Sequence, residues 1–258
     1  MTKLIIGNWK MNPETIEQAR GILLPIEHKM HLVQENLEVC VCPPAVFLAP
    51  LNHTSHNVVL GAQNVSWLDG GPLTGEVSGS QLKQWKVKYV ILGHSERRIY
   101  LGETEEMISK KIVQVLKTRL VPVVCLGGDK AAKKDEMKPL VTRQFHAAIK
   151  NLDRKQIEKI VFAYEPTWAI STVKNSEHAS GEHARELILH IQELLSHEVG
   201  EARAKNMLIL YGGTVNKNNV HEYTKYPEID GALVGAASLD PGDFWEVVHE
   251  FYRESIHS

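Results

Sequence analysis

The residue of this chain best placed to do chemistry is Glu165, which ends a short apolar run and is followed directly by Pro166. A proline fixes its own φ and keeps the preceding residue extended, so Glu165 is expected to leave the end of a strand rather than to enter a helix. The bulky Trp168 and then the polar segment 171–179 follow it. This pattern predicts a carboxylate base beneath a loop. A strand-end glutamate that faces water would give the same local sequence, so the rest of the chain has to separate the two interpretations.

Other polar residues and glycines also stand directly after apolar runs. Singly, each has an ordinary structural explanation as a turn, a helix start or a tight corner. Their joint occurrence is harder to explain in this way, because a base, a cation, an imidazole and two glycine corners would have to coincide. They are Asn8 and Lys10 after the first run, His94 and Glu96 after the fourth, Gly212, Gly213 and Thr214 after the seventh, and Gly235 and Ala236 after the eighth.

These residue types suit proton transfer on a phosphorylated substrate. Lys10 offers positive charge to an anionic substrate and to an oxyanion that forms during reaction. His94 precedes a helix expected near Ser95, whose positive end disfavours the imidazolium and leaves a neutral hydrogen-bond donor. Glycine corners after the seventh and eighth strands of a barrel often bind phosphate. With Glu165 as the base, the predicted reaction moves a proton between adjacent carbons through an enediolate. A Schiff base on Lys10 is less favoured, because Glu96 is available as its ion-pair partner.

The alternation of elements along the chain predicts how these residues are positioned. Eight short apolar runs rich in β-branched residues alternate with amphipathic segments, which is typical of βα units around a parallel sheet. A chain of 258 residues with eight such units favours a closed (β/α)8 barrel (TIM barrel) in one domain, residues 1–258. The first run lacks the glycine-rich turn of a Rossmann fold. Strands are expected at 4–9, 37–42, 58–63, 89–93, 121–126, 160–164, 207–211 and 229–234, and helices at 14–32, 105–119, 137–152, 182–199 and 244–255.

Composition excludes several other classes of protein. The net charge of −2 and the absence of a basic block argue against nucleic acid or an anionic membrane as a partner. Cys40, Cys42 and Cys125 lie in apolar runs and are expected to be reduced, packed thiols in a reducing cytosol. No run has the length of a membrane span or the form of a signal peptide, so a cytoplasmic location is expected. No spacing of histidine and carboxylate suggests a metal, and no cofactor is expected.

At five places these residues fall within longer segments that resemble the triosephosphate isomerase family, in order, at similar spacing and from one end of the chain to the other. The match is highly specific. The segments are Gly7-Asn8-Trp9-Lys10-Met11-Asn12, Leu92-Gly93-His94-Ser95-Glu96-Arg97-Arg98, Ala163-Tyr164-Glu165-Pro166-Thr167-Trp168-Ala169-Ile170, Tyr211-Gly212-Gly213 and Leu233-Val234-Gly235.

The resemblance implies a cofactor-free, cytoplasmic enzyme of glycolysis and gluconeogenesis that interconverts dihydroxyacetone phosphate and D-glyceraldehyde 3-phosphate. By it, Glu165 is the base, His94 the neutral electrophile, Lys10 and Asn8 the groups that bind substrate and oxyanion, and Glu96 the partner of Lys10. This family is also the worked case from which the combination of carboxylate base, neutral histidine and closing loop is usually taught, so that agreement is not independent support.

The resemblance further implies a homodimer in which the loop around Thr74-Gly75-Glu76 reaches into the partner subunit, and a loop N–H at Ser171 that contacts the phosphate. Several positions depart from the family pattern. The segment 171–179 is about three residues longer and has lost two glycines, which predicts altered closing of this loop and a turnover limited by that motion. The other departures are Thr214 in place of serine, Ala236 in place of a glycine, and Gly128, next to Asp129, in place of a glutamate.

Two alternatives stay open from the residues alone. The first is a sister isomerase for a four-carbon keto-sugar phosphate, because one extra hydroxymethylene is worth only about 1–3 kcal/mol of discrimination. The second is a non-catalytic binder of sugar phosphates that has kept the barrel. Such a binder would not need a base, yet Glu165, His94 and Lys10 are all present.

Overall fold

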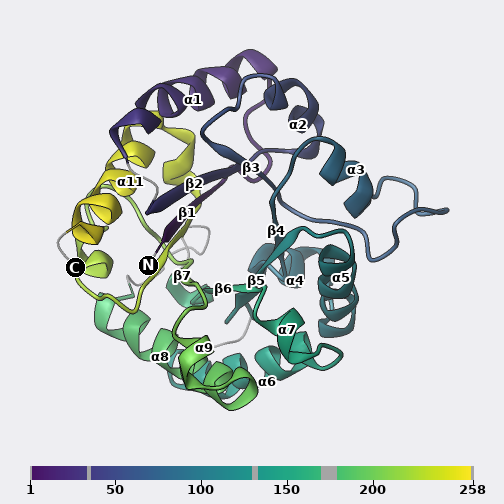
Figure 1. The fold of residues 1–258 in the computed structure, drawn as a ribbon, viewed down its shortest axis with the longest axis vertical. Coiled ribbons are helices and arrows are strands. Elements are labelled where there is room, and N and C mark those ends of the chain that lie inside the picture. The colour runs from purple at the N-terminus through teal and green to yellow at the C-terminus, as the bar shows by residue number, and fades with distance from the viewer. Residues whose placement is uncertain (1, 34–35, 130–132, 170–178, 257–258) are drawn as a thin grey trace.

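Eight parallel strands close into a barrel in the computed structural model, which describes residues 2–33, 36–129, 133–169 and 179–256. Each strand pairs with the next in sequence, and the first closes on the last through the register Leu4 to Gly231. Helices surround the strands (Figure 1), so the predicted (β/α)8 barrel is confirmed. That residues 1–258 form one domain stays a prediction. The strands are β1 (Lys3–Asn8), β2 (Leu37–Cys42), β3 (Val59–Ala62), β4 (Tyr89–Leu92), β5 (Val121–Leu126), β6 (Val161–Tyr164), β7 (Ile209–Tyr211) and β8 (Gly231–Val234).

The five predicted helices form, and side-chain caps fix where several of them begin. Thr15, Thr104, Ser180 and Asp240 each accept a backbone N–H of the first turn, which satisfies a donor that the helix itself leaves unpaired. These helices are α1 (Ile16–Lys29), α5 (Glu105–Lys117), α6 (Met137–Ile149), α8 (Gly181–Val199) and α11 (Pro241–Ser255). Within the described residues, none is both long and apolar enough to cross a bilayer.

Several shorter helices were not predicted, because their sequences carry little periodicity. The helix α2 (Ala45–Asn52) is apolar at most positions and contains Pro50, so no polar face marks it as a helix. The helix α3 (Gly79–Gln84) has six residues, too few for a repeat to show. The helix α4 (Ser95–Leu101) is the exception, because a helix beginning near Ser95 was predicted. The remaining short helices are α7 (Arg154–Ile157), α9 (Glu201–Ala204) and α10 (His221–Thr224), with 3-10 turns η1 (Met30–Leu32), η2 (Lys134–Glu136), η3 (Thr167–Ala169) and η4 (Ala236–Leu239).

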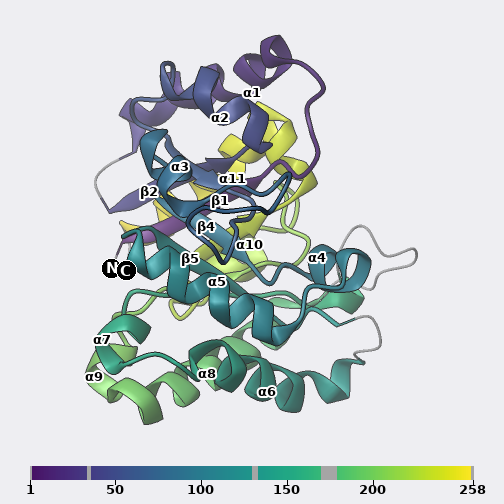
Figure 2. The ribbon, with the colours of Figure 1, turned by 90° about the vertical axis from the view of Figure 1, so that its right-hand side faces the viewer.

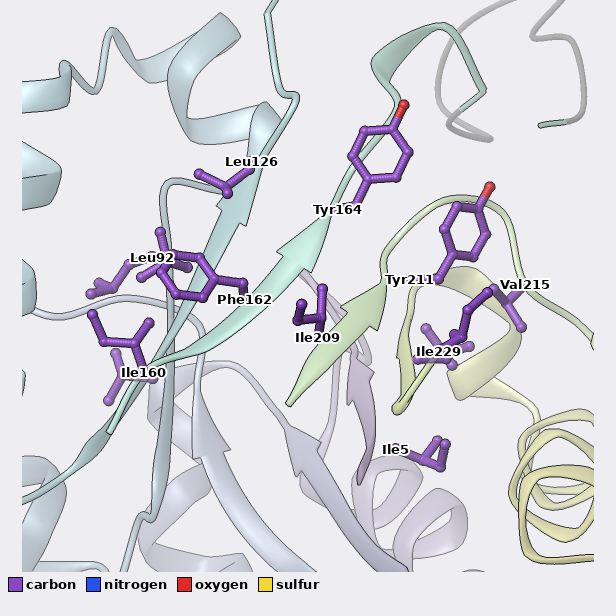
Figure 3. Close-up of a cluster of buried hydrophobic side chains, with 14 of the residues drawn as sticks. Ile5, Leu92, Leu126, Ile160, Phe162, Tyr164, Ile209, Tyr211, Val215 and Ile229 are labelled. Atoms are coloured by element: carbon purple, nitrogen blue, oxygen red, sulfur yellow. The ribbon is translucent and has the colours of Figure 1, made fainter. Parts of the chain in front are cut away.

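Alternation along the strands divides the apolar side chains into an inner and an outer cluster. On β6, Ala163 belongs to a cluster made of strand residues that fills the barrel, whereas Phe162 and Tyr164 pack with the surrounding helices. Figure 3 shows Tyr164 at the end of β6 and Tyr211 at the end of β7, with ring centroids 6.4 Å apart. All three cysteines, Cys40, Cys42 and Cys125, are buried free thiols of the inner cluster, which agrees with the expectation of reduced thiols.

Asp230 is a buried carboxyl group at the opposite end of the barrel from the residues singled out above. Its Oδ2 accepts the Ile209 N–H at 2.9 Å, and its Oδ1 lies 4.0 Å from Lys3 Nζ. Burial disfavours the charged form more than these contacts favour it, so the pKa of Asp230 is raised to about 6. The native state therefore holds this proton more tightly than the unfolded chain, whose aspartates titrate near pH 3.9.

Replacing Asp230 with asparagine is expected to stabilise the protein at pH 7. A raised carboxyl pKa contributes stability that is present below about pH 4 and is lost as the pH rises through about 6. Asparagine imitates the protonated form, so the free energy of unfolding at pH 7 should rise by up to about 3 kcal/mol, and the difference should vanish near pH 4. Urea unfolding of both proteins between pH 4 and 8 measures this, with Asp135→Asn as an exposed control. An Asp230→Asn variant no more stable than wild type at pH 7 would contradict it.

Candidate active site

A cavity of about 400 Å³ opens at the carboxyl ends of the strands, where the sequence placed the chemistry. Nine of the predicted site residues line it, although they come from five strands that are distant in sequence. Glu96 stands behind Lys10 rather than on this wall, and Ser171 lies outside the described residues. The nine are Asn8, Lys10, His94, Glu165, Gly212, Gly213, Thr214, Gly235 and Ala236.

Glu165 is almost fully buried directly after β6, where its N–H donates to Leu126 O at 2.7 Å. Its Oε2 accepts the Ser95 N–H at 2.9 Å, at the start of α4, and its Oε1 lies 2.9 Å from His94 Nε2. Burial alone would raise the pKa of Glu165, but His94 and the Ser95 N–H outweigh it and the pKa is lowered. The carboxylate is therefore ionised at neutral pH, as a base must be. Sequence reasoning missed the Ser95 N–H, because only the fold brings it to β6.

His94 is held between Glu96 and Glu165. Its Nδ1 accepts the Glu96 N–H at 3.3 Å, so in this arrangement the ring proton sits on Nε2 and points at Glu165. Burial opposes charge on the ring, yet the Glu165 carboxylate outweighs burial and raises the pKa of His94. The sequence predicted that the positive end of the helix would lower the pKa of His94. The net shift is upward instead, because a full negative charge on Glu165 at 2.9 Å has a larger effect on this pKa than the partial charge of a short helix. The sequence predicted a donating imidazole at this position without indicating which ring nitrogen carries the proton.

Lys10 is held in an unusual backbone conformation that aims its ammonium group at the cavity. Its φ is 54°, a left-handed value that L-residues with side chains rarely adopt. Asn8 Oδ1 accepts the Lys10 N–H at 3.1 Å, and Gln63 Nε2 donates to Lys10 O at 2.7 Å, so two amide side chains maintain that conformation. Lys10 Nζ contacts Glu96 Oε1 at 2.5 Å, the predicted ion pair. Gln63 was missed, although its place at the end of the third apolar run was available as a signal.

The glycine corners differ in what they offer. Gly212 donates its N–H to Tyr164 O at 2.8 Å, so that group is already used within the protein. A Cβ on Gly212 would stand 3.0 Å from Glu165 Cγ, and the glycine thus makes room for the carboxylate. The backbone N–H groups of Gly213 and Gly235 have no acceptor among the described residues and line the same cavity. They are the groups that can hold a phosphate.

Steric crowding explains why residue 128 is a glycine. A Cβ on Gly128 would lie 2.8 Å from Ser95 Cα, so the loop after β5 packs directly on the residue whose N–H holds Glu165. A glutamate here would push that contact apart. Asp129 does not supply a carboxylate to the cavity in place of that glutamate. The Oδ2 atom of Asp129 lies 3.5 Å from Arg143 instead.

The cavity combines a carboxylate base, a histidine donor and a lysine with backbone N–H groups that can hold an anion. These groups can transfer protons on a small anionic substrate, so the chain is a barrel enzyme of the acid–base class. The particular family follows from comparison with known proteins. The family model described as triosephosphate isomerase matches residues 3–251, and the chain belongs to that family.

Relatives named triosephosphate isomerase cover nearly the whole chain. That of Moorella thermoacetica is 40% identical over 249 residues, which are 95% of this chain and 97% of the relative. That of Dictyoglomus turgidum is 38% identical over 249 residues, with 95% and 98% covered. That of Caldanaerobacter subterraneus is 39% identical over 251 residues, with 95% and 98% covered.

Proposed function

We infer that this protein catalyses the interconversion of dihydroxyacetone phosphate and D-glyceraldehyde 3-phosphate, a step of glycolysis. The observation that carries this conclusion is the ionised, buried Glu165 in one cavity with Lys10 and His94, in a chain of the triosephosphate isomerase family. The four-carbon alternative is not favoured by its relatives, which are named triosephosphate isomerase.

In the mechanism that we propose, Glu165 removes the proton from the carbon next to the substrate carbonyl. The electron pair of that C–H bond forms the carbon–carbon double bond of an enediolate, and the carbonyl oxygen takes up negative charge. Lys10 Nζ and His94 Nε2–H stabilise that charge. Glu165 then returns the proton to the neighbouring carbon, while the hydroxyl proton of the first carbon passes through His94 to the former carbonyl oxygen. The first carbon thereby becomes the aldehyde carbonyl, which completes the isomerisation without a cofactor or metal.

The contacts of Glu165 suggest how substrate changes the site. In the structure its carboxylate accepts the Ser95 N–H and lies 2.9 Å from His94 Nε2. On binding substrate, Glu165 leaves His94 to reach the substrate carbon, which frees the His94 donor for the substrate oxygen. We place the phosphate at the N–H groups of Gly213 and Gly235, between Thr214 and Ala236. Ser171, expected to add a further N–H, lies outside the described residues.

A coupled assay with three- and four-carbon ketose phosphates side by side tests this function. Turnover of dihydroxyacetone phosphate with kcat/KM well above that of the four-carbon ketose is the expected result. Preference for the longer substrate would overturn the substrate assignment, and no turnover of either would overturn the enzymatic function in favour of a sugar-phosphate binder.

We also propose that the protein is cytoplasmic and acts as a homodimer through the loop that carries Thr74-Gly75-Glu76. This loop, between β3 and α3, projects from the barrel (Figure 1). A second cavity of about 650 Å³, beside the first, is lined by the exposed apolar residues Met11, Tyr100 and Leu101. An exposed apolar surface of this kind fits a protein partner. Asn8, Lys10 and His94 line both cavities, so a second copy seated there would support the active site from behind.

Thr74→Arg is expected to weaken the dimer, because the longer cationic side chain would have to enter a cavity already lined by the cations Lys10 and Arg97. We expect the dissociation constant of the dimer to rise by at least about 30-fold, the effect of changing a hot-spot residue. Sedimentation velocity over a range of protein concentrations measures it. Leu189→Arg, on the exposed side of α8, serves as the control and should leave the dimer intact. A monomeric wild-type protein, or a Thr74→Arg variant that dimerises normally, would refute this assembly.

A further inference from the structure

His183 links the helix α8 to both sides of the segment that carries Glu165. Its Nε2 lies 2.9 Å from the hydroxyl of Tyr164, the residue immediately before Glu165. Its ring meets the ring of Trp168, three residues after Glu165, edge to face with centroids 5.2 Å apart. The side view of Figure 2 shows α8, which carries His183 in its first turn, beside α6 on one side of the barrel. One imidazole thus touches the chain on both sides of the base.

The position of Trp168 depends on packing and ring contacts rather than on hydrogen bonds. Its indole Nε1 is buried and has no hydrogen-bond partner among the described residues. The ring packs against the main hydrophobic core, meets the edge of His183 and has the ammonium group of Lys134 5.8 Å from its centroid. Loss of the His183 ring would remove the aromatic contact that sets the orientation of the indole.

Tyr164 transmits the same constraint to the base through the main chain. Its carbonyl accepts the Gly212 N–H at 2.8 Å, and the next residue, Glu165, donates its own N–H to Leu126 O. The hydroxyl of Tyr164, held by His183, is the outer end of this arrangement. Fixing both the ring and the carbonyl of Tyr164 defines the direction in which the Glu165 side chain leaves the strand.

We propose that His183 is a positioning residue for the catalytic base, a role that rests on the proposed isomerase function. It acts by holding Tyr164 through a hydrogen bond and Trp168 through a ring contact, so that Glu165 meets the substrate carbon in reactive geometry. A base misplaced by about 1 Å can lose about 100-fold in rate. The effect should appear in kcat rather than KM, because His183 does not line the substrate cavity.

The surroundings of His183 keep its ring neutral, which suits a hydrogen bond to a phenol. Burial, and then Lys134, lower the pKa of His183, Glu186 on its own helix opposes this, and Lys138 of α6 adds to the lowering. Asp135 of η2 also lines this side, in a small cavity with these groups. At neutral pH the imidazole is therefore uncharged and can pair with the Tyr164 hydroxyl in either direction.

The chain provides a matched control on the same helix. His190 Nε2 bonds to Thr142 Oγ1 at 2.8 Å, much as His183 Nε2 bonds to Tyr164, but within the described residues its polar partners, Thr142 and Glu193, lie away from Glu165 in the sequence and in the site. We expect His183→Ala to lower kcat by about 10-fold or more with KM changed less than about 2-fold. His190→Ala should lose comparable stability, measured by thermal unfolding, and keep wild-type kcat. Combining His183→Ala with Tyr164→Phe should slow the enzyme less than the product of the two single effects, because both remove the same bond.

Hydrogen exchange of residues 164–169 gives a readout that does not depend on catalysis. It should speed up in His183→Ala and stay unchanged in His190→Ala. If the alanine variant fails to fold, His183→Gln, which keeps a hydrogen-bonding group but no ring, is measured in its place and should show a smaller kcat loss of the same kind. Equal kcat for the His183 and His190 variants, or unchanged exchange in 164–169, would overturn the positioning role. An inactive wild-type protein would instead refute the proposed function, and the exchange experiment would still decide whether His183 holds this segment.

Discussion

Glu165→Asp is expected to lower kcat by about 10²–10³-fold while the barrel stays folded. The shorter side chain withdraws the carboxylate by about 1 Å, which spoils the near-attack geometry with the substrate carbon. In the free enzyme it also shortens the reach to the Ser95 N–H and to His94 Nε2, both now at 2.9 Å. Those two contacts lower the pKa of Glu165, so the pKa of the aspartate should be lowered less from the ordinary value of an aspartate.

Steady-state kinetics and circular dichroism of the two proteins check this prediction. Glu27→Asp is the matched control, because Glu27 is also a buried glutamate that accepts backbone N–H groups, those of Asn57 at 2.6 Å and Val58 at 2.9 Å. Glu27→Asp should reduce stability without changing kcat, because Glu27 joins α1 to the segment before β3 and does not line the cavity. A Glu165→Asp enzyme with near-wild-type kcat would show that Glu165 is not the base.

Much of this arrangement could be predicted from the sequence, because strands have strong local signals and a parallel barrel gathers their ends. The runs at 37–42 and 121–126 match β2 and β5 in full, and the others differ from the observed strands by one or two residues at one or both ends. Once the barrel is assumed, the residues at the carboxyl ends of the strands are expected at the same end of it. That rule alone brought Asn8, Lys10, His94 and Glu165 together.

The contacts between those residues could not be predicted in the same way. That Glu165 binds the Ser95 N–H depends on how closely the loop after β5 packs on α4, which only the absence of a side chain at Gly128 permits. Gly212 was expected to offer its N–H to phosphate, but that group bonds to Tyr164 O, and its use is to leave space. The net pKa shift of His94 likewise depends on one carboxylate at 2.9 Å, which no local pattern encodes. The long segment 171–178, where the sequence departs most from its family, lies outside the described residues.

Lys10→Met should be the more severe change for substrate capture, with kcat/KM lowered by about 10³-fold. Methionine keeps the length and the apolar stem, so the loss reports the ammonium charge. The variant binds an anionic substrate more weakly, which raises KM, and it stabilises the enediolate oxygen less, which lowers kcat. It also removes the positive charge that acts to lower the pKa of His94. The pKa of His94 should therefore be raised further, which strengthens its contact with the Glu165 carboxylate.

Lys88→Met separates this loss of catalytic charge from the loss of an ion pair. Lys88 Nζ pairs with Glu38 at 2.6 Å, a distance like that of Lys10 to Glu96, but it precedes β4 at the other end of the barrel. Its variant should keep wild-type kcat and KM. Lys10→Met combined with Glu96→Gln removes the carboxylate left without its partner and should recover stability but not rate, because the substrate charge still lacks its cation. Recovery of kcat/KM in that double variant would mean that Lys10 serves only to neutralise Glu96, and the assigned role of Lys10 at the reacting oxygen would be wrong.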